Sequence, residues 1–304
     1  MSLPEGDQVA RAWLAVDDRL ACYPAGLRDV VRRFARDVIS PAYYAGWRHP
    51  ADLAQWSGLP EAVGTTATVA HLLIYLTLAL EDDLLDGEGR SHLSPRALTV
   101  VTALLHWDAA GLLAGVAGSA TTFWQAATRA RAWWGEATLW DMGAQPAGGG
   151  EFAEELRLRA GKAAALSVAP AAVLVAAGRS DLLPVADRLL EAIYLAIILL
   201  DDLQDWETDL RAGQRNFLVE LVRQGRQDLP GGEDVAAALT GGAGERLCAI
   251  AVQRLAAAQE GLPDALLAPL RSHADRLIET CNAYADLCRA GARWVAAMLE
   301  STGR

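Results

Sequence analysis

Hydrophobic residues recur along most of the chain at intervals of three and four positions, the spacing of one face of an α-helix. No segment alternates apolar and polar residues for more than a few positions, so the pattern predicts helices and no strands. Short runs rich in glycine and proline separate the periodic segments. The expected helices lie near 5–21, 27–38, 60–86, 94–113, 117–141, 150–178, 182–211, 214–225, 245–258 and 262–300.

Two of these helices are apolar on nearly every face, at 66–80 and at 188–200, as is typical of central helices enclosed by others. The segment from Gly231 to Gly244 is the loosest, and we expect it to be a loop. No interval is long and polar enough to separate two domains. The sequence therefore predicts one all-α domain, a helical bundle over residues 1–304.

The two apolar helices end in matching acidic sequences. "IYLTLALEDDLLD" covers 74–86 and "IYLAIILLDDLQD" covers 193–205, and 8 of the 13 positions are identical. In each, the apolar run leads to two aspartates, two spacers and a third aspartate. The match indicates that two similar helices carry equivalent acidic clusters.

Aspartates four residues apart lie on one face of a helix, as do Asp82 and Asp86, and Asp201, Asp205 and Asp209. Like charges at that spacing repel, and the C-terminal end of a helix disfavours anions, so these clusters cost stability unless cations bind there. Carboxylate oxygens are the ligands that suit Mg²⁺. A solvated helix end would explain one such cluster equally well, but the repetition favours a metal site that handles a diphosphate.

At these residues the chain resembles the class I isoprenoid synthases, which include trans-isoprenyl diphosphate synthases, terpene cyclases and squalene/phytoene synthases. The resemblance is specific at "EDDLLD" (81–86) and "DDLQDWETDLRAGQRNFL" (201–218), and moderate at "RLRAGKAAAL" (157–166). It implies an all-α bundle of the isoprenoid synthase type with a central apolar pocket. In that fold the two acidic motifs lie across the pocket mouth, and three Mg²⁺ ions with nearby basic residues grip a prenyl diphosphate.

The resemblance also implies roles for individual residues. The catalytic aspartates are Asp82, Asp86, Asp201 and Asp205. The metal ligands are Asp82, Asp83, Asp86, Asp201, Asp202, Asp205 and Asp209. The second motif fits the pattern of cyclases, of chain-elongating synthases and of squalene/phytoene synthases, so its register stays open. The residues expected to bind the diphosphate are Lys162, which is the only lysine of the chain, Arg215 and Arg159.

A reactive carbocation needs a dry pocket, and aromatic faces can stabilise it. The chain has ten tryptophans. Tyr75 and Tyr194 each lie two helical turns before the aspartates, on roughly the same face. We expect the pocket to be lined by Tyr75, Tyr194 and Phe123 or Trp124.

Three fates of the cation are open: cyclisation, chain elongation and head-to-head condensation. Elongation needs a second diphosphate site, but in "AGWRHP" (45–50) Trp47 and His49 stand where chain elongators have basic residues, and Arg90 is followed by Ser91. Head-to-head synthesis needs further motifs that are not clear here. The sequence therefore predicts a magnesium-dependent class I terpene cyclase, a lyase that cyclises a linear prenyl diphosphate of C15–C25 and releases diphosphate.

The net charge, the cysteines and the apolar runs indicate which binding partners and which cellular location to expect. A net charge of −11 does not suit a nucleic-acid-binding protein. Scattered cysteines, no signal-like N-terminus and apolar runs of about ten residues suggest a cytoplasmic protein without a transmembrane segment. The resemblance also allows a homodimer.

Overall fold

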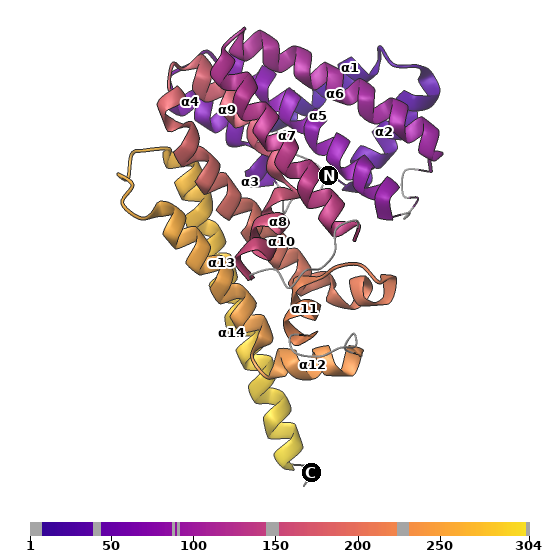
Figure 1. Cartoon of the computed structure of the whole chain (residues 1–304), viewed down its shortest axis with the longest axis vertical. Coiled ribbons are helices and arrows are strands. Elements are labelled where there is room, and N and C mark those ends of the chain that lie inside the picture. The colour runs from indigo at the N-terminus through magenta and orange to yellow at the C-terminus, as the bar shows by residue number, and fades with distance from the viewer. Residues whose placement is uncertain are drawn as a thin grey trace. The chain divides into compact units, whose positions relative to one another are not determined.

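The computed structural model describes the chain except for residues 1–7, 39–43, 87–88, 90–91, 144–151, 224–230 and 302–304. All regular elements within the described residues are helices (Figure 1). The predicted all-α class is therefore confirmed. The helices are α1 (Gln8–Leu20), α2 (Ala25–Val38), α3 (Tyr44–Trp47), α4 (His49–Trp56), α5 (Glu61–Asp86), α6 (Pro95–Ala117), α7 (Thr121–Asp141), α8 (Phe152–Gly161), α9 (Val168–Ala176), α10 (Leu183–Ala212), α11 (Phe217–Arg223), α12 (Gly232–Thr240), α13 (Ala243–Gln259) and α14 (Ala268–Ser301). Two short 3₁₀ helices, η2 (Ala164–Ser167) and η3 (Ser180–Leu182), precede α9 and α10.

The chain divides into two compact units. The first unit contains Met1–Ala147, Gly161–Asp187 and Leu267–Leu270. The second unit contains Gly148–Ala160, Arg188–Leu266 and Arg271–Arg304. The single domain expected over residues 1–304 stays a prediction.

Helix α5 is the central helix of the first unit, as its apolar sequence predicts. It packs against α1, α4, α6 and α9 (Figure 1). Because α5 meets neighbours on several sides, its leucines at 72, 73, 76 and 80 are all fully buried. Burial of apolar side chains on this scale is the main driving force for folding, and it fixes where the acidic end of α5 lies within the unit.

By length and composition alone, α5 and α6 could each cross a membrane. In α5, 67% of the most apolar window is buried inside the fold, which accounts for its sequence as that of a central helix. In α6 the buried share is only 33%, and Val100 and Trp107 are exposed. The expectation of no transmembrane segment therefore stays a prediction, and apolar runs in these helices are longer than the sequence pattern suggested.

The expected helix 150–178 is interrupted. Helix α8 ends at Gly161, and α9 begins only at Val168. Pro170 explains this break, because a proline ring collides with the carbonyl four residues earlier unless it sits in the first turn of a helix. The interruption places Lys162 outside regular helix, directly after α8.

The segment Gly231–Gly244, expected to be a loop, contains α12. The backbone N–H of Gly231 donates to Asp234 Oδ2 at 2.9 Å, so a carboxylate in the first turn stabilises the start of this helix. Gly244 then allows α13 to approach the second acidic motif. A Cβ at Gly244 would lie 2.7 Å from Cys288 Sγ and 3.3 Å from Leu203 Cδ1. A side chain at residue 244 would therefore force Cys288 to shift.

Candidate functional site

The first acidic motif occupies the last turns of α5. Asp82 is half-exposed, whereas Asp83 is buried. Consecutive residues on a helix point in directions about 100° apart, so only one of the two can face outward here. The Asp86 backbone ends the helix, and its side chain lies outside the described part of the structure. Of the described pair, Asp82 is the carboxylate that is accessible to a cation.

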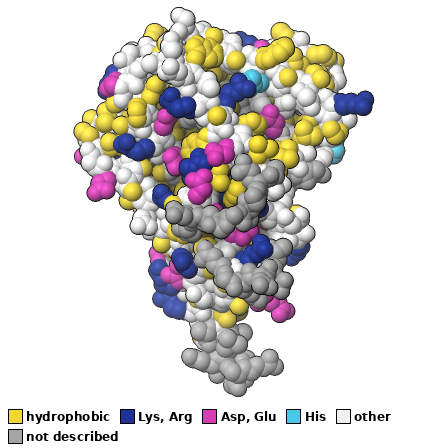
Figure 2. Space-filling model, in the orientation of Figure 1, with side chains coloured by type: hydrophobic (Ala, Val, Ile, Leu, Met, Phe, Trp, Pro, Cys, Tyr) yellow, Lys and Arg dark blue, Asp and Glu magenta, His cyan; other side chains and the backbone are white. Residues whose placement is uncertain are grey.

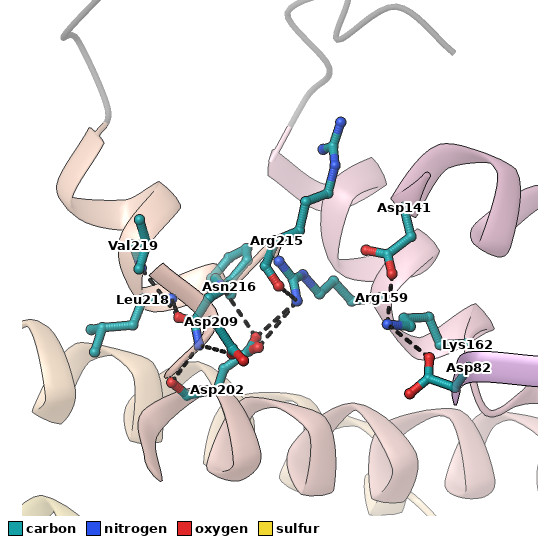
Figure 3. A network of polar contacts seen from close by, with 11 residues as sticks. Asp82, Asp141, Arg159, Lys162, Asp202, Asp209, Arg215, Asn216, Leu218 and Val219 are labelled. Atoms are coloured by element: carbon teal, nitrogen blue, oxygen red, sulfur yellow. Dashed lines mark hydrogen bonds and ion pairs between the residues drawn. The ribbon is translucent and has the colours of Figure 1, made fainter. Parts of the chain in front are cut away.

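Lys162 lies beside this motif, as expected for a residue that binds the same ligand. Its Nζ is 2.6 Å from Asp141 Oδ2 and 4.0 Å from Asp82 Oδ1 (Figure 3). Asp141 is the last residue of α7, and no motif in the sequence marks it. Folding therefore places the only lysine between a predicted metal ligand and a carboxylate that the sequence did not single out.

Gly161 fixes the position of this lysine. A Cβ at residue 161 would lie 2.6 Å from Trp133 Nε1 and 2.7 Å from Ala137 Cβ, both on α7. Real Cβ atoms essentially never come so close to a neighbour. The absence of a side chain at Gly161 thus lets the backbone before Lys162 lie against the helix that ends in Asp141.

The electrostatics around the first motif favour partial neutralisation. Burial raises the pKa of Glu81 to about 7, although the charge of Arg131 opposes the shift. Burial also lowers the pKa of His106, and Arg131 adds to that effect. Glu81 is therefore protonated in part near neutral pH, which reduces the negative charge next to Asp82.

An aromatic group packs below the first motif within the first unit. The Trp47 ring meets the Tyr75 ring edge to face at 5.6 Å, and Trp13 meets Trp47 in the same way at 5.8 Å. Trp47 is 2% exposed. The indole of Trp47 is thus part of the core, in contact with one of the expected pocket residues.

The other expected pocket residues lie in different environments. Phe123 is fully buried, whereas Trp124 is 40% exposed and donates from Nε1 to the Gly118 carbonyl at 3.3 Å. Tyr194 in the second unit is buried, which raises the pKa of its hydroxyl and keeps it neutral. Of the alternatives Phe123 and Trp124, the buried ring is the one suited to an apolar interior, and a pocket lined by these residues stays a prediction.

The second acidic motif lies on α10 in the second unit. Asp201 and Asp205 are exposed and one turn apart, and Asp209 continues the same face. Asp209 is partly buried, and its Oδ2 accepts a hydrogen bond from Asn216 Nδ2 at 2.7 Å. The two exposed carboxylates are therefore accessible, and the third is held in a fixed orientation.

Asp202 differs from these carboxylates because it is buried in an ion pair. Arg159 Nη1 on α8 lies 3.2 Å and 3.1 Å from its two carboxylate oxygens, and both side chains are less than 10% exposed (Figure 3). The backbone N–H of Phe217 donates to Asp202 Oδ2 at 3.1 Å. A predicted metal ligand and a predicted diphosphate ligand are thus bonded to each other, and together they hold α8, α10 and the start of α11.

Asn216 is the residue of this site that the sequence did not identify as functional. Its Nδ2 also donates to the Asp202 carbonyl at 2.8 Å, and its Oδ1 accepts from the N–H groups of Leu218 and Val219 at 3.0 and 3.3 Å. It therefore caps α11 and orients Asp209 at the same time. An asparagine directly before a helix is a recognisable N-cap signal, but the link to Asp209 depends on the tertiary fold.

The Arg215 side chain extends away from the Asp202 and Asp209 carboxylates (Figure 3). Its carbonyl accepts a bond from Arg159 Nη1 at 3.4 Å. The preceding turn contains Gly213 at φ 71°, a conformation that favours glycine. The guanidinium of Arg215 is thus directed toward a different environment from that of Arg159.

The donor chemistry fits Mg²⁺. The accessible groups are carboxylates, and these hard oxygens suit Mg²⁺ or Ca²⁺. Within the described residues, no three His, Cys, Asp or Glu side chains are already arranged around a common point. Mg²⁺ commonly binds through one or two carboxylates and completes its shell with water and phosphate oxygens, so this arrangement is compatible with it.

The visible surface of the described residues carries acidic and basic side chains interspersed among apolar ones (Figure 2). On this face no large area has a single sign of charge.

Comparisons with known proteins identify a similar fold. No protein-family model and no curated protein matches the sequence. Among solved structures, the geranylgeranyl pyrophosphate synthetase from the archaeon Geoglobus acetivorans is similar over 90% of this chain and 100% of that chain. The TM-score is 0.68 and the sequence identity 17%. The likeness confirms the fold that the two aspartate motifs predicted.

Proposed function

We propose that this chain, which has the fold of the isoprenoid synthases, is a Mg²⁺-dependent class I terpene cyclase that acts on a linear prenyl diphosphate. The reaction we propose is ionisation of the allylic C–O bond, cyclisation of the carbocation and release of diphosphate. The support for a diphosphate-processing site is the grouping of Lys162 with Asp82 of the first motif and with Asp141. The exposed carboxylates Asp201 and Asp205 of the second motif add to it.

The metal ligands in this proposal are the carboxylates that are accessible or at the motif ends. They are Asp82, Asp86, Asp201, Asp205 and Asp209. Bound Mg²⁺ supplies positive charge that stabilises the leaving diphosphate. Lys162 and Arg215 add fixed cations that bind the phosphate oxygens and hold the leaving group in place.

We assign a different task to Asp202 and Arg159. Each is buried and compensates the charge of the other at about 3 Å. Taking either side chain out of this pair would leave the other charge buried without a partner, at a cost of about 3–5 kcal/mol. In this proposal the pair positions the metal-binding face of α10 and does not contact the substrate.

The observation that favours cyclisation over elongation is the buried contact of Trp47 with Tyr75. A second diphosphate site would need cations at this end of the chain. Trp47 supplies an apolar ring instead, and neighbouring Arg48 forms an ion pair with Asp52 at 3.1 Å. Arg90 and Ser91, which also distinguish the chain from elongators, lie outside the described residues.

Chain elongation is the second candidate, because the solved structure reported above is named a geranylgeranyl pyrophosphate synthetase. Both candidates require the same metal-binding aspartates. They differ in whether isopentenyl diphosphate is consumed. The third possibility, head-to-head condensation, has no contact in the described residues that favours it over the other two.

The test is a set of incubations of the purified chain with Mg²⁺ and geranyl, farnesyl or geranylgeranyl diphosphate, each with and without isopentenyl diphosphate. Organic extracts are analysed by mass spectrometry, and diphosphate release is measured in parallel. A cyclic hydrocarbon or alcohol formed from one substrate alone supports the cyclase. Longer prenols formed only with isopentenyl diphosphate would show that the chain is an elongating synthase.

Asp205→Asn is the test variant and Glu207→Gln its matched control, because each removes one exposed carboxylate from α10. The first is expected to lose turnover and the second to keep it. If Asp205→Asn keeps as much turnover as Glu207→Gln and the wild type, the second motif has no metal-binding role.

A further inference from the structure

Lys162 is held by two carboxylates that differ in distance and in exposure. Asp141 Oδ2 is 2.6 Å from Nζ and its side chain is 19% exposed, whereas Asp82 Oδ1 is 4.0 Å away with a side chain 48% exposed. The attraction between charges falls with distance, and solvent screens an exposed pair more strongly than a buried one. Of these two carboxylates, Asp141 is therefore the stronger partner of Lys162 and Asp82 the weaker one.

Asp141 also depends on this contact. Its Oδ1 is buried and has no hydrogen-bond partner among the described residues. A carboxylate with one buried oxygen that accepts no hydrogen bond needs a nearby cation to compensate its charge. Lys162 provides that charge at a distance typical of a strong, charge-assisted hydrogen bond.

The identity of the cation matters for this arrangement. Lys162 is the only lysine of the chain, and every other strongly basic side chain is an arginine. The ammonium group of lysine is compact and carries three donors on a flexible stem, so it can keep one bond while the others change partner. A planar guanidinium has a fixed fork of donors and adapts less readily. The geometry thus suits a cation that stays on Asp141 and exchanges its second partner.

We propose that Asp141 is a positioning residue that holds Lys162 beside the first motif, so that its ammonium exchanges Asp82 for a diphosphate oxygen when substrate binds. Without ligand, Lys162 partly neutralises Asp82. With ligand, Asp82 is released to the metal, and Lys162 remains anchored on Asp141 while it binds the phosphate. This inference rests on the proposed diphosphate site and adds a residue that neither motif contains.

The test uses the fact that Lys162 is the only lysine. An amine-reactive acylating reagent modifies Lys162 and the α-amino group, and mass spectrometry of the digested chain separates the two products. The α-amino group serves as the internal reference. Because the amine must leave its ion pair before it reacts, Asp141→Asn is expected to raise the rate at Lys162 about tenfold. Asp141→Glu, which keeps the charge, is expected to stay close to the wild-type rate.

Two further variants separate the roles of the carboxylates. Asp82→Asn removes the weaker contact and is expected to change the rate at Lys162 by less than about twofold. Glu136→Gln removes an exposed carboxylate from the same helix as Asp141 and is expected to have no effect. If Asp82→Asn accelerates labelling as much as Asp141→Asn does, or if Asp141→Asn has no effect, Asp141 is not the anchor. If Asp141→Asn does not fold, a labelling rate of Asp82→Asn more than about twofold above the wild-type rate still overturns the assignment of Asp141 as the stronger partner.

Ligand protection tests the exchange itself. Inorganic pyrophosphate with Mg²⁺ is expected to slow labelling of Lys162 in the wild-type chain and to protect it less in Asp141→Asn. Turnover of Asp141→Asn is expected to fall about tenfold in kcat with recovery in Asp141→Glu. Equal protection in both chains would overturn the inference while leaving the proposed function intact. If the wild-type chain shows neither protection by pyrophosphate nor turnover, the proposed function is refuted instead. The labelling rates of Lys162 without ligand would then still test whether Asp141 anchors it.

Discussion

Arg159 and Asp202 form a buried ion pair, although they are 43 residues apart in the sequence. Their neighbours in the motifs, Lys162 and Asp201, have more exposed side chains. Adjacent charged residues of each motif therefore have two tasks. Arg159 and Asp202 bind each other and hold their helices together, whereas Lys162 and Asp201 remain accessible to a ligand.

The first prediction separates these tasks. Asp202→Asn is expected to lower the free energy of unfolding by about 3 kcal/mol, because Arg159 loses its compensating charge in a buried site. Asp205→Asn is expected to leave the melting temperature nearly unchanged, since Asp205 is exposed, and to reduce diphosphate release at least 100-fold. Thermal unfolding and a diphosphate-release assay on both variants check this. A stable Asp202→Asn protein without activity would mean that Asp202 binds metal after all.

The second prediction concerns Asn216, which caps α11 and binds Asp209. Asn216→Ala is expected to cost about 1–2 kcal/mol of stability through the lost cap. It should also raise the Mg²⁺ concentration needed for half-maximal turnover, because Asp209 loses its orienting donor. Asn216→Asp keeps an acceptor for the cap but repels Asp209, so it should recover part of the stability and none of the metal affinity. Metal titrations with the same response in all three proteins would refute the link to Asp209.

The third prediction concerns Gly161. Gly161→Ala places a Cβ within 2.7 Å of α7 atoms, so α7 or the segment carrying Lys162 must shift. The expected cost is about 1–3 kcal/mol, together with reduced turnover. Gly135→Ala is the control on α7, because a Cβ there meets nothing within 4 Å. Similar stability and turnover for the two variants would show that close packing at Gly161 does not position Lys162.

The fourth prediction concerns pH. Burial lowers the pKa of His71 to about 4, although backbone groups of Leu166 and Gly46 favour the charged form. In the unfolded chain its pKa is 6.5, so between pH 6.5 and 4 the unfolded state binds the proton and the folded state does not. Stability is therefore lost as the pH falls through this range, by up to about 3 kcal/mol from this residue.

The check compares the wild type with His71→Gln, which cannot take up the proton. The variant is expected to be less stable at pH 7, because the buried site is altered, but its melting temperature should fall less between pH 7 and pH 5. Other buried groups, such as His273 and Glu81, titrate in both proteins and cancel in the comparison. If the melting temperatures of the two proteins fall by the same amount between pH 7 and pH 5, His71 is not a source of acid sensitivity.

Helix content and the position of the acidic motifs follow from the sequence, because they depend on local periodicity. The spacing of apolar residues predicts α5 and α10, and the four-residue spacing of aspartates places Asp201 and Asp205 on one face. The break between α8 and α9 was missed, although Pro170 marks it. Helix α12 was also missed, because the glycine pairs on either side of it indicated a loop, although Asp234 in its first turn is a local start signal.

Only the tertiary structure decides which charged residues pair with one another. Local spacing assigns Asp201 and Asp202 alike to the motif, but burial beside Arg159 distinguishes the second from the first. Likewise, no pattern in the chain links Asp141 to Lys162 or Asn216 to Asp209, because these contacts join segments whose approach depends on close packing, as at Gly161. The sequence alone determined the acidic chemistry and the helices that carry it. Folding decides which charged residue stays accessible to a ligand and which becomes a buried support. Burying an unpaired charge costs free energy, so a charged side chain in the core must lie beside an opposite charge.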